Sequence, residues 1–199
     1  MPLQHFQSAI AAFDQANAQD PNKEVFEGKE FPKELLYAQR MSEMQQRFAP
    51  EASEAVKLAV RAQHIQRWKI PRGDYAMDKP GYMLWRTGLY KFHAETAGNL
   101  MKEAGYDDEM TARTKLIISK KNLKSDAETQ MMEDIVDLVF IEYYMLAFAG
   151  QHPEYNEAKW ITIIKKTWNK MSPRAHEFAL AGNIKLPEAL IPLILKAVQ

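Results

Sequence analysis

The fold class of this chain is indicated most strongly by residues 133–142, which read EDIVDLVFIE. Apolar side chains cover most of the circumference of a helix with this sequence, so we expect the helix to lie in a protein core. Burial of its carboxylates, at Asp134, Asp137 and Glu142, costs free energy unless each is paired, hydrogen-bonded or bound to a metal ion. The segment therefore predicts either a metal ligand or general base, or a structural ion pair or narrow solvent-facing stripe.

Helical periodicity extends outward from this segment over nearly the whole chain. We expect helices at residues 3–16, 32–48, 50–68, 82–104, 107–119 and 125–148, and two or three more between residues 153 and 199. Pro32 and Pro50 suit first helical turns, Gly105 suits a helix end, and Ser125 or Asp126 should cap the longest helix. Residues 22–31 lack a clear alternating pattern and are predicted to form a loop. The prediction is an all-α fold forming a single compact domain over residues 1–199.

Composition limits the classes of function. The chain has 199 residues, 46% of them hydrophobic and 26% charged, which is the balance of a globular protein with a core. Lys+Arg and Asp+Glu are both 26, so the zero net charge argues against a general binder of nucleic acids or membrane surfaces. The absence of cysteine excludes disulfides, thiolate metal sites and thiol catalysis. With no secretory signal or membrane-spanning stretch evident, we expect a cytoplasmic protein.

Histidines on predicted helices are the next candidates for a functional site. His64 ends an apolar helix face and has Arg61 and Arg67 within one turn on either side. A neutral imidazole is the commonest metal ligand, and arginines suit phosphate or carboxylate groups. His93 has aromatic neighbours and Glu95 nearby. For both histidines the alternative is a buried imidazole hydrogen-bonded to a backbone carbonyl.

Other sequence signals for chemistry are weaker. The basic connection at residues 120–124, which includes Lys121, precedes a predicted helix N-terminus where anions bind readily, although a solvated loop is the alternative. The chain has no glycine-rich phosphate loop, no G-x-S-x-G motif and no H-E-x-x-H motif. Phosphate-loop enzymes, serine hydrolases of the α/β type and zincin proteases are thereby excluded.

Several motifs together resemble the bacterial and fungal family catalogued as domain of unknown function 4202. They lie at residues 14–22, 33–41, 61–68, 70–72, 85–87, 92–95, 133–134 and 170–174. The resemblance covers nearly the whole chain, and the combination is specific. Membership of this family implies no settled function.

The order of elements also resembles the HD superfamily of helical, metal-dependent phosphohydrolases. That superfamily carries a His on one helix, a His-Asp pair at the end of the next and an Asp on a later helix. By this resemblance Tyr37 stands at the first His, His64-Ile65 at the pair and Asp134 at the last Asp, while His93 is similar to an additional His of some members. Tyrosine is a poor ligand near neutral pH because its pKa is about 10, and isoleucine cannot ligate.

The resemblance implies a metal-dependent phosphohydrolase acting on a nucleotide or another small phosphorylated compound. His64, His93 and Asp134 would hold a divalent metal ion, and Glu133 would orient water or act as the base. The cations that would neutralise phosphate are Arg61, Arg67, Arg86 and Lys121. One alternative is a metal-free protein that binds an anionic small molecule in the same cavity. Another is a scaffold protein whose polar residues are structural.

Overall fold

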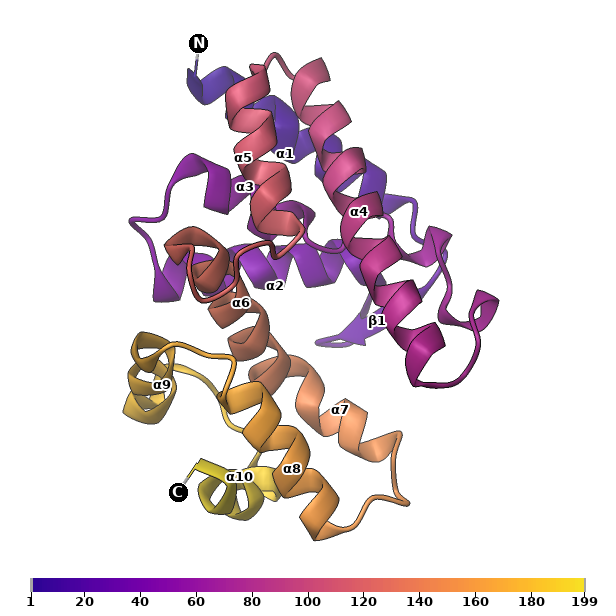
Figure 1. Ribbon diagram of the computed structural model, residues 1–199, viewed down its shortest axis with the longest axis vertical. Coiled ribbons are helices and arrows are strands. Elements are labelled where there is room, and N and C mark those ends of the chain that lie inside the picture. Colours follow the sequence, from indigo (N-terminus) through magenta and orange to yellow (C-terminus); the bar gives the residue numbers. More distant parts are fainter. Residues whose placement is uncertain (1, 199) are drawn as a thin grey trace. The chain divides into compact units, whose positions relative to one another are not determined.

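The computed structural model describes residues 2–198, and helices account for most of them (Figure 1). The all-α fold class predicted from the sequence is confirmed. The chain divides into two compact units, one ending at Met132 and the other beginning at Glu133. The single domain expected from the length of the chain stays a prediction.

The first unit is a set of helices around a core of large apolar side chains. Its helices are α1 (Pro2–Ala18), α2 (Lys33–Phe48), α3 (Glu54–Ala62), α4 (Lys79–Glu103), α5 (Asp108–Ile118) and the first turns of α6 (Ala127–Val139). Helix α1 packs against α2, α3 and α4, and α5 packs against α3 and α4. The fully buried side chains of this unit include Phe13, Met41, Met44, Leu58, Ile65, Met101 and Ile117.

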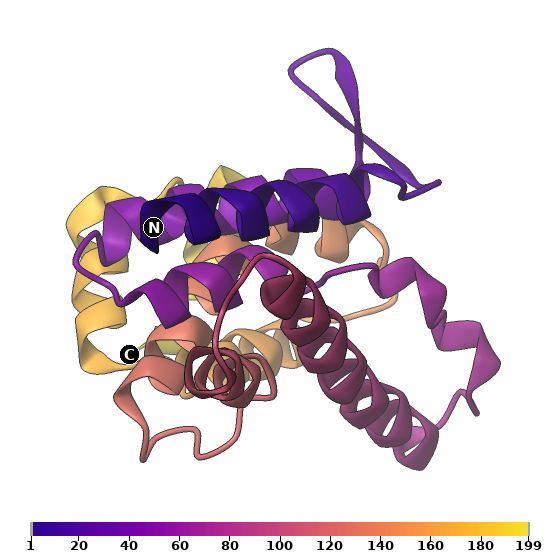
Figure 2. The same cartoon turned by 90° about the horizontal axis from the view of Figure 1, so that it is seen from above.

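A β-hairpin lies between α1 and α2, where the sequence predicted a loop, so that prediction was wrong. Strand β1 (Lys23–Phe26) pairs antiparallel with β2 (Lys29–Pro32), and Figure 2 shows the hairpin extending beyond the end of α1. Its two-residue turn places Glu27 at φ 51° and Gly28 at φ 74°. Positive φ at both central residues is the requirement of a type I′ turn, which Asn-Gly or Asp-Gly usually signals.

Contacts from α2 hold the hairpin in place. Arg40, which is buried on α2, forms an ion pair with Glu24 of β1. The same guanidinium lies 4.7 Å from the ring centroid of Phe26, within the range of a cation–π interaction. Two four-residue strands offer little alternating pattern, so these contacts with α2 support a hairpin that its own sequence signals only weakly.

The third predicted helix is much shorter than expected. It starts at Glu54 rather than Pro50 because the hydroxyl of Ser53 accepts a hydrogen bond from the Val56 N–H (3.3 Å) and caps the helix. It ends at Ala62, and Gln66 adopts a left-handed conformation (φ 52°) that no α-helix continues through. His64 and Ile65 therefore lie in a turn and not on the helix on which the sequence placed them.

Other helix ends agree closely with the sequence. Gly105 follows α4 with φ +94°, as expected of a glycine just beyond a helix C-terminus. Asp107 caps α5 by accepting a hydrogen bond from the Met110 N–H at 2.8 Å. The long α4 begins three residues before the predicted start, because Asp78 accepts from the Gly81 N–H and caps it there.

The second unit consists of the rest of α6 and the elements that follow it. A π-helical turn (Phe140–Tyr144) joins α6 to α7 (Met145–Gly150), so the predicted long helix is interrupted by a wider turn. Three further helices, α8 (Glu157–Trp168), α9 (Pro173–Phe178) and α10 (Ile191–Val198), confirm the expected number. A second π-helical turn (Ala179–Asn183) and a 3₁₀ turn (Glu188–Leu190) connect α9 to α10, which packs against α8. Among residues 2–198, none of the helices is long and apolar enough to cross a membrane.

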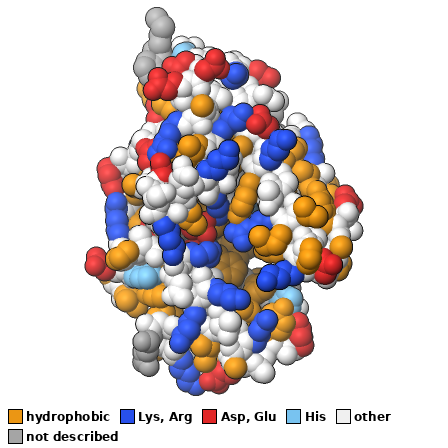
Figure 3. Space-filling view, in the orientation of Figure 1, with side chains coloured by type: hydrophobic (Ala, Val, Ile, Leu, Met, Phe, Trp, Pro, Cys, Tyr) orange, Lys and Arg blue, Asp and Glu red, His pale blue; other side chains and the backbone are white. Residues whose placement is uncertain are grey.

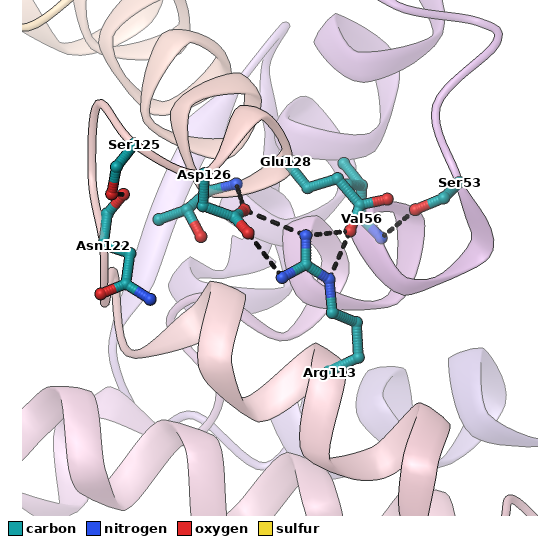
Figure 4. Close-up of polar contacts among 8 residues, drawn as sticks. Ser53, Val56, Arg113, Asn122, Ser125, Asp126 and Glu128 are labelled. Carbon is teal, nitrogen blue, oxygen red and sulfur yellow. Dashed lines mark hydrogen bonds and ion pairs between the residues drawn. The ribbon is translucent and has the colours of Figure 1, made fainter.

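An arginine links α5 to the start of α6 (Figure 4). Arg113 donates to both carboxylate oxygens of Asp126, at 2.7 and 3.0 Å, and to Glu128 at 2.6 Å. Asp126 also accepts from the Thr129 N–H at 2.8 Å, which makes it, rather than Ser125, the cap of α6. The hydrogen bonds from Arg113 and then from Thr129 lower the pKa of Asp126 to about 2.

Replacing Asp126 should remove stability in a pH-dependent way. The carboxyl pKa is lower in the folded protein than in the unfolded chain, so its contribution is present above about pH 4 and is lost as the pH falls towards 2. Asp126→Asn should lower the free energy of unfolding by about 1–2 kcal/mol at pH 7 and by much less near pH 2. Urea unfolding across this pH range measures the difference. Glu103→Gln, at an exposed position, is the control, and a pH-independent loss in Asp126→Asn would contradict the assignment.

Candidate functional site

The turn at residues 63–66 is held by side chains from two helices. The backbone N–H of Gln66 donates to Oδ1 of Asn17, on α1, at 2.9 Å. The carbonyl of Ile65, on the other side of the same peptide bond, lies 2.8 Å from Nδ1 of His93, on α4. Asn17 and His93 are 1% and 2% exposed, so both side chains that hold this peptide are buried. The peptide bond between Ile65 and Gln66 is thus fixed on both sides.

His93 is a neutral imidazole, and only one of its two ring nitrogens makes a hydrogen bond within residues 2–198. A carbonyl oxygen can only accept, so Nδ1 of His93 carries the proton and donates to Ile65. Burial, together with the neighbouring His64, lowers the pKa of His93 to about 3, so the ring stays neutral. Its Nε2 then presents a lone pair, and this buried atom has no hydrogen-bond partner within residues 2–198. An unsatisfied buried acceptor costs about 1–3 kcal/mol, which indicates a place for a ligand.

His64 lies between a cation and a carboxylate. Nη1 of Arg67 is 2.8 Å from Nε2 of His64, and because a guanidinium only donates, Nε2 is the acceptor. The proton is then on Nδ1, which is 3.4 Å from Oε2 of Glu34. Burial and the charges of Arg67, Lys120 and Lys33 lower the pKa of His64 well below its ordinary value. His64 is therefore also neutral.

Glu34 is the acidic member of this cluster. It is buried near the start of α2, where its backbone N–H donates to Oδ2 of Asp20 at 3.0 Å. Burial raises the pKa of its side chain to about 7, although the charge of Arg67 opposes the shift. Near neutral pH the carboxyl therefore exists in both protonated and charged forms, a property typical of functional sites.

Tyr37 lies beside His64. Its ring stacks on the imidazole with centroids 4.1 Å apart, and its hydroxyl donates to Oε1 of Gln63 at 2.8 Å. The rings of His64 and His93 have centroids 5.9 Å apart. The first unit thus brings together Tyr37, His64, His93 and Glu34, and we call these four residues the imidazole cluster.

The predicted phosphate-binding cations have different surroundings. Arg67 lies next to the imidazole cluster through its contact with His64. Its guanidinium carbon is 5.0 Å from the ring centroid of Trp85. Arg86 donates from Nε to the hydroxyl of Tyr90 at 2.5 Å, and Lys121 is exposed. Arg61 binds both carboxylate oxygens of Asp14 at 2.7 Å and so links α3 to α1. Lys and Arg side chains are frequent on the face shown in Figure 3.

The predicted carboxylates Glu133 and Asp134 lie in the second unit, each with partners of its own. Asp134 accepts from the Ser172 N–H at 2.7 Å and from the Ser172 hydroxyl at 2.6 Å, and Ser172 caps α9. Lys170 donates to Glu133 at 2.9 Å and to Asp137 at 2.5 Å. Burial lowers the pKa of Lys170, but the charges of Asp137 and Glu133 outweigh it and the net shift is upward. These contacts agree with the structural ion pair that the sequence left open.

Sequence reasoning missed Glu34, Asn17 and Gln63. One signal for Glu34 was present, because it precedes Tyr37 by three residues and so shares its helix face. Asn17 and Gln63 had no such signal, since their partners are distant in sequence or set by the turn. Within residues 2–198, no three His, Asp or Glu side chains are already grouped closely enough to hold a metal ion.

A known protein family matches most of the chain. The family described as Domain of unknown function (DUF4202) matches residues 7–194. The chain belongs to this family. The membership predicted from the motifs is thereby confirmed, and the matched span includes the imidazole cluster as well as Glu133 and Asp134. Comparisons with curated proteins and with solved structures found no match.

Removing the Asn17 side chain should destabilise the first unit. In Asn17→Ala the partly buried N–H of Gln66 loses its acceptor, so the free energy of unfolding should fall by about 1–3 kcal/mol. Chemical denaturation measures this loss. Asn99→Ala, at an exposed position on α4, should change stability by less than about 0.5 kcal/mol. Equal effects of the two substitutions would show that Asn17 does not hold the turn.

Proposed function

We propose that this protein is a metal-dependent phosphohydrolase that acts on a nucleotide or another small phosphorylated compound, with its site at the imidazole cluster. The observation that carries the proposal is the buried Nε2 of His93, a lone pair without a partner among the described residues, next to a second neutral imidazole. Neutral imidazoles are the form in which histidine binds metal ions.

The hydrogen bonding of His93 suits a ligand of a divalent metal ion. A ligating histidine usually donates its other N–H to a carbonyl or carboxylate, which fixes the ring and its tautomer. His93 has this arrangement through its bond to Ile65. A divalent metal ion, when bound, supplies an activated water and polarises a phosphoryl oxygen. The roles predicted from the sequence for Asp134 as a ligand and for Glu133 as a base are not part of this site, because both carboxylates belong to the second unit and have partners there.

Cations around the imidazole cluster suit a phosphorylated substrate. Arg67, Lys120 and Lys33 are close enough to lower the pKa of His64. The planar guanidinium of Arg67 can donate two parallel hydrogen bonds to a phosphate group. Arg61, Arg86 and Lys121 stay in the proposal as further cations, although Arg61 would have to leave Asp14 to reach a substrate.

The resemblance to the HD superfamily supports the same reaction class. Tyr37, His64 and His93, which that resemblance placed in one site, lie together in the first unit. The HD-like helical arrangement is part of the proposal, since a shared order of elements does not by itself transfer an activity.

A second candidate function is metal-free binding of a small anion. One observation favours it. The guanidinium of Arg67 donates a hydrogen bond to Nε2 of His64, so that nitrogen is not available to bind a metal ion. In this alternative Arg67 would turn towards the anion while both imidazoles stay neutral. Binding that is unaffected by chelators would separate it from the hydrolase.

Hydrolysis of phosphate esters should depend on both a metal ion and His93. Protein purified without chelator should release phosphate from a panel of nucleotides and sugar phosphates with added Mn²⁺, Co²⁺ or Zn²⁺. His93→Gln should lower kcat/KM by at least about 100-fold, in line with the loss of a metal-site residue. The release of phosphate is followed colorimetrically.

His152→Gln provides the matched control, because His152 is a partly exposed histidine of the second unit that pairs with Glu154. Its activity should equal that of the wild type. If the wild type binds phosphate compounds tightly but hydrolyses none with any of these metals, the hydrolase is excluded and the binding protein is favoured.

A further inference from the structure

We propose that Glu34 is the acidic ligand of a divalent metal site formed by Glu34, His64 and His93 within the first unit. The inference rests on the proposed function, which it deepens by naming a ligand that neither the motifs nor the HD resemblance assigned. Glu34 contributes a buried carboxylate from α2, His64 lies in the turn after α3, and His93 lies on α4.

The distance between Glu34 and His64 is the first argument. Oε2 of Glu34 and Nδ1 of His64 are 3.4 Å apart. An N–H···O hydrogen bond is shorter, about 2.7–3.2 Å. Two ligand atoms bound to one tetrahedral zinc ion at about 2.0–2.1 Å lie roughly 3.3–3.4 Å from each other. The pair is therefore spaced as two neighbouring ligands of one ion would be.

The unpartnered nitrogen of His93 is the second, independent argument. Nε2 of His93 is buried without a hydrogen bond, and the His93 ring is 5.9 Å from that of His64. Two imidazoles and one carboxylate are a donor set of catalytic zinc sites that leave a position for water. A small movement of these side chains would complete the group.

Coordination through Nδ1 of His64 would also affect Arg67. The proton of the neutral ring would then be on Nε2, so Arg67 could no longer donate to that atom. Its guanidinium would become available for a phosphate group. Metal binding and phosphate binding would thus be coupled through one imidazole.

The carboxylate of Asp134 is a less suitable ligand. Both of its oxygens already accept hydrogen bonds from Ser172, whose hydroxyl in turn accepts from the Ala175 N–H at the start of α9. Ligation by Asp134 would disturb this cap. The carboxylate of Glu34, by contrast, lies 3.4 Å from Nδ1 of His64 and caps no helix through its side chain within the described residues.

The test is calorimetric titration of the chelator-treated full chain with Zn²⁺ and with Mn²⁺, using the wild type, Glu34→Gln and Asp134→Asn. The wild type should bind about one equivalent, and Glu34→Gln should weaken binding at least tenfold. Asp134→Asn should bind as the wild type does. The backbone hydrogen bond from Glu34 to Asp20 does not depend on the side chain, so Glu34→Gln should fold, and its metal-free melting temperature checks this.

Two results would overturn the inference: no binding of either metal by the wild type, or unchanged affinity in Glu34→Gln. If Glu34→Gln fails to fold, His64→Gln and His93→Gln replace it, and normal metal affinity in both would also overturn the site. Phosphate release by the same samples separates the two proposals. Metal binding that depends on Glu34 but is not accompanied by hydrolysis supports the metal site and contradicts the hydrolase. Metal-dependent hydrolysis with normal metal affinity in Glu34→Gln supports the hydrolase and contradicts Glu34 as a ligand.

Discussion

The peptide bond between Ile65 and Gln66 is the constraint on which the candidate site depends. Asn17 of α1 accepts a hydrogen bond from its N–H, and His93 of α4 donates one to its carbonyl. Two helices therefore hold one peptide from opposite sides. The left-handed backbone of Gln66 is held in place by the same contacts. With this turn fixed, His64 is positioned between Glu34 and Arg67. The geometry of the site is thus a result of how the helices of the first unit pack.

Local signals in the sequence were enough to predict much of the fold. Gly105 and Asp107 mark helix ends through conformations that depend only on neighbouring residues, and both lie where expected. The turn at Glu27-Gly28 and the end of α3 at Ala62 were missed. Those two features depend on contacts with distant elements, such as Arg40 for the hairpin and Asn17 for the turn, and no local pattern records such contacts.

The candidate site was partly predictable for the same reason. His64 and His93 stood out as residue types with known chemistry, and the resemblance placed Tyr37 beside them. The sequence could not show that His93 donates through Nδ1 and leaves Nε2 without a partner, because the tautomer is set by the Ile65 carbonyl 28 residues away. The apolar pattern of residues 133–142 correctly indicated buried carboxylates at Asp134 and Asp137, whereas Glu142 is only half-buried. Only the structure shows that Glu133 and Asp137 share Lys170.

The two hydrogen bonds to the Ile65–Gln66 peptide limit which residues members of this family can carry at positions 17 and 93. Asn17 and His93 are far apart in the chain but bind the same peptide. By holding the Ile65–Gln66 peptide in place, each side chain supports the hydrogen bond that the other makes. A change at one position would therefore weaken the contact made from the other. A replacement of His93 must still donate to the Ile65 carbonyl if the peptide is to stay in place. Within the family we expect a hydrogen-bond donor at this position even where the residues around His64 differ.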